Sequence, residues 1–197
     1  ALGLQQWAVR YNGVGNAEDR PAKMIFKGNR LYITGHTSNG INNDVVTLKY
    51  DVTGVLLNEI VFAGAGAGLD EGDDLFILNN AVYVAGTEFV AGNMNDYLLI
   101  KYDTLLNQLW KKNYNGTADT DDRAFGVSAT STDVYVTGSS AGAGTGNDVA
   151  LVRYNASTGT QNWAKRYKSA GAFNDEAYSV VTDAAGNIYT GGVTGSA

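Results

Sequence analysis

Tyr32-Ile33-Thr34-Gly35 is the first of four copies of one phrase, which returns as Tyr83-Val84-Ala85-Gly86, Tyr135-Val136-Thr137-Gly138 and Tyr189-Thr190-Gly191-Gly192. Self-similarity at a period of about fifty residues is the signature of a repeat architecture. The phrase is rich in aromatic and β-branched residues and its glycine ends the run, so it predicts a strand that leads into a loop. The fold is therefore expected to repeat a unit built around this strand.

A second phrase recurs in step with the first and ends in Tyr-Asp or Tyr-Asn. Its copies are equally spaced and occupy residues 44–51, 96–103 and 148–155. In the first copy Val46 and Leu48 point to one face of a strand and Val45 points to the other, so both faces are largely apolar. A strand of this kind is expected to be covered on both sides.

Two further segments complete the unit. A small apolar segment such as 122–129 precedes the tyrosine phrase, and a fourth segment such as 163–167 follows the turn at 155–159. No stretch has the 3.6-residue period of an amphipathic helix. Four short antiparallel strands in about fifty residues form one blade of a β-propeller, whose neighbours cover both faces. The sequence therefore predicts an all-β propeller.

The repeats set the expected limits of a single domain spanning residues 1–197. We expect a lone fourth-type strand at 5–12, complete blades at about 19–63, 73–114 and 122–167, and a partial blade at 176–193.

This order leaves the last blade without its third strand. We expect the chain to be an arc of a longer ring of roughly six to eight blades, completed by the remaining blades of a longer protein. The alternative is closure through a second copy, or a small four-bladed ring with an incomplete last blade.

Composition narrows the classes of partner. The chain has 197 residues, 25 glycines, one proline, no cysteine and a net charge of −6. The negative charge disfavours nucleic acid and anionic membranes as partners. The absence of cysteine excludes disulfides and thiolate chemistry. No apolar run has the length of a membrane span and the N-terminus lacks a signal-peptide pattern, so we predict no membrane insertion and either a cytosolic chain or a mature exported segment.

The repeat resembles the bacterial β-propeller repeat family known as SBBP. The match is best in the third unit, through Trp110-Lys111-Lys112-Asn113-Tyr114-Asn115-Gly116, Asp133-Val134-Tyr135-Val136-Thr137-Gly138 and Gly146-Asn147-Asp148-Val149-Ala150. The resemblance implies a secreted or cell-surface bacterial protein and brings no shared catalytic residue. The stretch from Tyr154 to Trp163 is also similar to the tryptophan-docking repeat of pyrroloquinoline-quinone enzymes, which adds a structural analogy only.

The expected role is a non-enzymatic scaffold that binds or displays protein or glycan through its blade loops. We assign no catalytic, cofactor-binding or metal-binding residue. His36 is interpreted as a loop residue, not a base. Trp7, Trp110 and Trp163 are interpreted as rings packed between blades, with an exposed platform for sugars as the alternative.

Acidic residues cluster ahead of each first strand, and the alternatives of calcium binding and catalysis both rest on these clusters. They are Glu18-Asp19, Asp70-Glu71-Gly72-Asp73-Asp74, Asp119, Asp121-Asp122 and Asp175-Glu176. We expect them, like Asp44, Asp96 and Asp148, to accept backbone hydrogen bonds in turns. Calcium is the one cofactor that such loops suit. The alternative function is a propeller hydrolase or lyase acting on glycans with loop carboxylates as acid and base, which a cluster of acids with raised pKa in one central pocket would favour.

Overall fold

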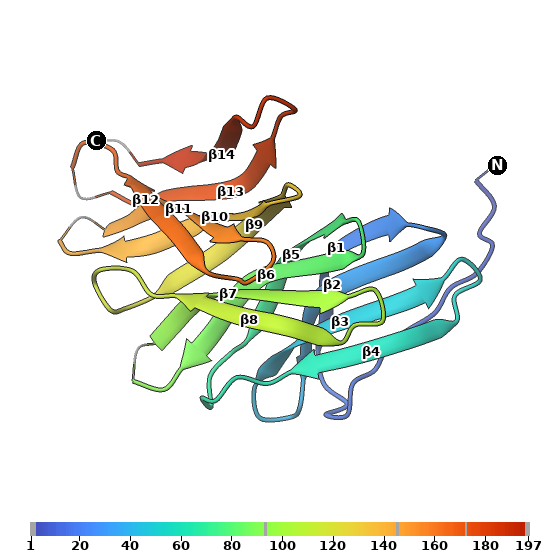
Figure 1. Ribbon diagram of the computed structural model, residues 1–197. Coiled ribbons are helices and arrows are strands. Elements are labelled where there is room, and N and C mark those ends of the chain that lie inside the picture. The colour runs from blue at the N-terminus through green and yellow to red at the C-terminus, as the bar shows by residue number, and fades with distance from the viewer. Residues whose placement is uncertain (1–2, 93, 145, 172, 196–197) are drawn as a thin grey trace.

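The computed structural model describes residues 3–92, 94–144, 146–171 and 173–195 (Figure 1). All of its regular elements are strands, and they form three four-stranded antiparallel sheets and one two-stranded sheet in simple up-and-down order. The strands are β1 (Asp19–Lys27), β2 (Arg30–Ser38), β3 (Asn43–Asp51), β4 (Leu56–Phe62), β5 (Glu71–Leu78), β6 (Ala81–Val90), β7 (Met94–Asp103), β8 (Gln108–Tyr114), β9 (Asp122–Ala129), β10 (Asp133–Gly142), β11 (Gly146–Asn155), β12 (Gln161–Tyr167), β13 (Asp175–Thr182) and β14 (Ile188–Thr194).

The four sheets are consecutive blades of a propeller arc. Each first strand packs on the preceding sheet, so β5 contacts β1, β2 and β3, β9 contacts β5, β6 and β7, and β13 contacts β9, β10 and β11. The first strands β1, β5, β9 and β13 therefore lie side by side at the inner edge, while β4, β8 and β12 lie at the outer edge (Figure 1). The predicted fold class, an all-β propeller arc of four-stranded blades, is confirmed.

The segment 5–12 corrects one expectation, because it forms no strand. It nevertheless lies where the outermost strand of a preceding blade would lie. Trp7 packs on Gly54 in the β3–β4 turn, just as Trp110 of β8 packs on Gly159 in the β11–β12 turn of the following blade. A β-ladder needs a neighbouring strand, and no strand among the described residues pairs with this segment.

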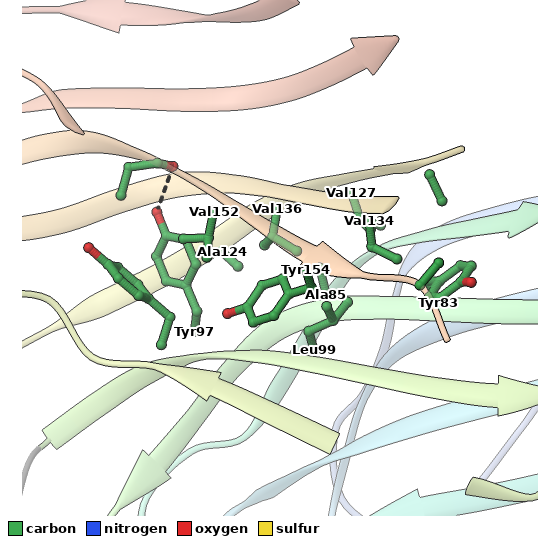
Figure 2. Packing of buried hydrophobic residues seen from close by; sticks show 14 residues of the cluster. Tyr83, Ala85, Tyr97, Leu99, Ala124, Val127, Val134, Val136, Val152 and Tyr154 are labelled. Atoms are coloured by element: carbon green, nitrogen blue, oxygen red, sulfur yellow. Dashed lines mark hydrogen bonds between the residues drawn. The ribbon is translucent and has the colours of Figure 1, made fainter. Parts of the chain in front are cut away.

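The core consists of side chains packed between neighbouring sheets. One cluster joins the first and second blades through residues such as Tyr32, Val45 and Leu98. Another joins the second and third blades, where Tyr97 and Leu99 face Val136 and Val152 (Figure 2). The Tyr97 hydroxyl donates a hydrogen bond across this interface to the Ala150 carbonyl, at 3.3 Å. The third strands β3 and β7 are buried on both faces, as their sequence predicts, whereas β11 is buried on one face and partly exposed on the other.

The glycine of the fourfold phrase is required by a β-bulge. In every blade the first strand has one extra residue opposite the second strand, and the bulge lies beside Gly35, Gly86, Gly138 or Gly192. A Cβ atom on any of these glycines would lie 1.9–2.0 Å from a carbonyl oxygen of the bulged strand. Only glycine permits this close approach of two backbones.

Candidate functional site at the inner bulges

The bulges place one blade-specific residue on each inner strand. The extra residues are Ala22, Asp73, Phe125 and Tyr178, at equivalent positions of β1, β5, β9 and β13. We call these four residues the bulge row. A bulge leaves its residue outside the hydrogen-bonded ladder and redirects the side chain, so bulges often lie next to binding sites. The glycine opposite each bulge repeats whereas the bulge row does not, so the row can vary while the bulge itself is kept.

Charged residues surround the bulge row with alternating sign. Arg20, Glu71, Arg123 and Glu176 occupy the equivalent position two residues before each bulge. A cleft of about 280 Å³ between the first and second blades contains Arg20, His36, Glu71 and Asp73. A neighbouring cleft of about 230 Å³ contains Glu71 and Arg123. The inner edge therefore offers both hydrogen-bond donors and acceptors to a polar ligand.

Asp73 is the carboxylate of this site whose pKa is raised. The pKa of Asp73 is raised from 3.8 to about 7: burial is the largest cause, the negative charge of Glu71 adds to it, and Arg123 opposes both effects. Its neighbour Asp74 has a structural role instead: it forms an ion pair of 3.3 Å with Lys23 and accepts a hydrogen bond from the Val127 backbone N–H. Asp74 thus links three blades, while Asp73 faces the cleft.

His36 also belongs to the site, so the prediction of a loop residue is wrong. It lies within β2, is largely buried, and its Nδ1 is 3.6 Å from the Glu71 carboxylate. Its neighbours Gly35 and Thr37 pair with β1 and β3, which extends the strand beyond the tyrosine phrase. His36 has no counterpart in the other repeats, because the equivalent residues are Thr87, Ser139 and Val193.

The third and fourth blades contribute aromatic rings to the same edge. The rings of Phe125 and Tyr178 pack at a centroid distance of 5.5 Å with their planes inclined by 45°. Tyr178 remains half exposed, and its hydroxyl donates a hydrogen bond of 2.7 Å to Glu176. An exposed ring next to carboxylates combines an apolar surface with polar groups, the composition of small-ligand sites.

The recurrent aspartates before each bulge have a structural role, as expected. Asp70, Asp122 and Asp175 are buried, and each accepts a hydrogen bond of 2.6 Å from the backbone N–H six residues earlier. Asp19 accepts the equivalent bond from Gly13 at 2.9 Å. These bonds fasten the loop that links successive blades. Among the described residues, no group of three or more His, Asp or Glu is placed to hold a metal ion.

The tryptophans pack against aromatic and glycine neighbours. Trp110 lies 6.1 Å from Tyr83 and Trp163 lies 6.3 Å from Tyr135, ring centre to ring centre. Trp7 is more exposed, and its indole N–H donates to the Val52 carbonyl at 2.8 Å. Trp110 and Trp163 lie on the outer strands β8 and β12, away from the bulge row, whereas Trp7 lies in segment 5–12 and lines a groove with Arg20 and Pro21.

The sequence matches no protein-family model and no curated protein. Among solved structures it is similar to an exo-beta-1,3-galactanase from Clostridium thermocellum, with 12% identity over 85% of this chain and 40% of the galactanase, and a TM-score of 0.52. A europium-containing methanol dehydrogenase matches with 15% identity over 74% of this chain and 24% of the enzyme, TM-score 0.47. A subtype N10 neuraminidase-like protein of A/little yellow-shouldered bat/Guatemala/060/2010 matches with 9% identity over 76% of this chain and 44% of its own, TM-score 0.48.

The chain thus spans less than half the length of each of these three proteins. At 12% identity, the likeness to the galactanase concerns the fold alone. Within the part of the chain that the structure describes, no helix has the length and apolar character needed to cross a bilayer.

Proposed function

We propose that this protein is a non-enzymatic binding scaffold whose bulge row and surrounding charges take a glycan ligand. The observation that carries the proposal is the bulge repeated at the same position of four inner strands with a different side chain on each. Repeated residues maintain the blades, whereas the bulge row specifies what is bound. This proposal places the ligand at the inner edge, whereas the sequence pattern favoured the blade loops.

A sugar suits this edge better than an extended peptide does. The half-exposed Tyr178 ring offers a flat apolar surface, and Asp73, Glu71, Arg20 and Arg123 offer acceptors and donors for hydroxyl groups. The pairing of an aromatic surface with a few polar groups fixes the orientation of a small ligand. A secreted or cell-surface location in a bacterium, implied by the family resemblance, would place such a site in contact with glycans.

A glycan array with a matched pair of variants tests the proposal. Tyr178→Ala removes a half-exposed ring at the inner edge, and Tyr167→Ala removes a comparably exposed ring from the outer strand β12. We expect wild type and Tyr167→Ala to bind the same glycans, and Tyr178→Ala to lose at least roughly tenfold in affinity. Equal binding by all three proteins, or the absence of any glycan ligand, would contradict the proposal.

The second candidate is a glycan-active hydrolase or lyase, and the raised pKa of Asp73 favours it. A carboxyl group with a pKa of about 7 is partly protonated at neutral pH, as a general acid has to be. Glu71, on the same strand, is the candidate for the second carboxylate. Turnover in a screen of glycan substrates that falls roughly 10²–10⁴-fold in Asp73→Asn would establish this activity and replace the binding proposal.

A further inference from the structure

The two ends of the arc present blade faces that other blades bury. The face of β1–β3 that points away from the second blade contains Met24, Leu31, Ile33, Val46, Leu48 and Tyr50, and also Phe26, which pairs with Leu31; we call it the leading face. The opposite end of the arc presents Val181, Tyr189 and Val193 of β13–β14; we call this the trailing face.

The strand register shows that residues on these two faces are equivalent to residues that pack between blades elsewhere in the molecule. Phe26 is equivalent to Ile77 of the second blade, since they pair with Leu31 and Val82. Phe26 is 60% exposed, whereas Ile77 is 8% exposed against the first blade. Likewise Tyr189 is equivalent to Tyr83, and is 55% exposed where Tyr83 is 3% exposed. Both ends therefore retain the apolar pattern of an interface without its partner.

The leading face is half covered, and the position of its uncovered half indicates which strands would cover it. Tyr11 of the N-terminal segment packs against Val46, Leu48 and Tyr50. The segment thus occupies the place of the outermost strand of a preceding blade. The inner part of the face stays open as an apolar groove of about 370 Å³ between this segment and β1–β2. The elements that would cover that groove are the first strands of a blade. The trailing face belongs to the first two strands of a blade, β13 and β14.

Charge is complementary between the two ends. Around the inner edge the equivalent residues alternate as Arg20, Glu71, Arg123 and Glu176, and neighbours of opposite sign share a cleft in the first two cases. If the trailing face of one molecule met the leading face of another, Glu176 would stand beside Arg20 and continue this alternation. Like charges at the same place would oppose the contact.

We propose that the trailing face of one molecule docks on the leading face of a second copy, head to tail. The contact extends the blade-to-blade interface already present three times within the chain. It is heterologous, so two or more copies close into a ring if the rotation permits and otherwise form an open chain. The free edge of β14 stays unpaired in this contact, which therefore rests on side-chain packing. The proposal does not rest on a ligand at the bulge row, and the two regions have Arg20 in common.

Sedimentation equilibrium over a range of concentrations tests the proposal with three variants of the 197-residue chain. Phe26→Asp damages only the leading face, Tyr189→Asp damages only the trailing face, and Ile41→Asp makes the same kind of change at an exposed loop residue. We expect wild type and Ile41→Asp to associate beyond the 20.8 kDa monomer, and each face variant alone to associate at least roughly tenfold more weakly.

Mixing the two face variants distinguishes head-to-tail docking from any other association. Phe26→Asp keeps an intact trailing face and Tyr189→Asp keeps an intact leading face, so an equimolar mixture can form one contact and should yield a dimer that grows no further. This dimer also shows that both variants are folded. A wild type that stays monomeric at every concentration, or variants that fail to complement each other, would overturn the proposal.

Discussion

The first and second blades have the same sequence pattern but different surroundings. Met24 and Leu75 occupy equivalent positions on β1 and β5, yet Met24 is 59% exposed and Leu75 is 1% exposed. The second blade has a sheet on each side, whereas the first has a sheet on one side and a half-covered face on the other. The comparison teaches that the repeat determines the strands, and that the neighbouring blade determines how much each position contributes to stability.

The largest expected difference comes from truncating this pair. Leu75→Ala leaves a cavity in the packed interface and should lower the free energy of unfolding by about 2–5 kcal/mol. Met24→Ala removes a half-exposed side chain and should change it by less than about 1 kcal/mol. Urea denaturation of both variants measures the contrast. Equal losses would mean that the two faces are equally covered in solution.

A pair of glycines in and beside the bulge gives the next largest effect. A Cβ on Gly86 would lie 1.9 Å from the Glu71 carbonyl oxygen, whereas a Cβ on Gly191 would meet nothing within 4 Å. Gly86→Ala forces the two strands apart and should cost about 1–3 kcal/mol or more. Gly191→Ala should be neutral or slightly stabilising, by up to about 1 kcal/mol. Thermal unfolding of both variants checks this, and a tolerated Gly86→Ala would refute the role given to the motif glycine.

Asp73 should give a smaller effect that depends on pH. Its pKa is raised from 3.8 to about 7 in the folded protein, mainly by burial. Between these values the folded state keeps a proton that the unfolded state releases, so the free energy of unfolding falls as the pH rises through this window. Asp73→Asn should make this fall less steep. Denaturation curves across the window measure both slopes, and identical slopes would show that the carboxyl group is not desolvated.

Calcium is expected to have the smallest effect. One carboxylate oxygen of each of Asp70, Asp122 and Asp175 accepts a backbone N–H bond and is thereby occupied within the fold. We therefore expect the same Tm with calcium chloride and with a chelator. A Tm that rises with calcium and falls with the chelator would establish a calcium site.

The sequence predicted the blades because each strand carries a local pattern. The tyrosine phrase returns about every fifty residues and the doubly apolar third strand repeats with equal spacing, and the structure has a sheet at each tyrosine phrase. Residues 5–12 share the Trp and Tyr of β8, so their pattern predicted a strand. A sequence pattern alone does not provide a neighbouring strand with which to form hydrogen bonds. This segment therefore lies where a strand would lie but forms no β-ladder.

The candidate site was less predictable than the fold. The acids before each first strand were visible, but only the register shows that Asp73 is an extra residue on a bulge while Asp70 and Asp74 are held by hydrogen bonds or ion pairs. His36 has no counterpart in the other repeats and gave no signal. One feature of the sequence does indicate where the site lies: the glycine of the fourfold phrase marks the position opposite each bulge.

The central claim is that equivalent positions differ because one blade lacks a complete neighbour. Thiol labelling tests it directly, because the chain has no native cysteine. The account predicts that M24C reacts rapidly with a thiol reagent in the dilute native protein and more slowly at concentrations where the molecules associate, while L75C stays protected throughout. Equal labelling of the two variants, or labelling of M24C that never depends on concentration, would contradict it.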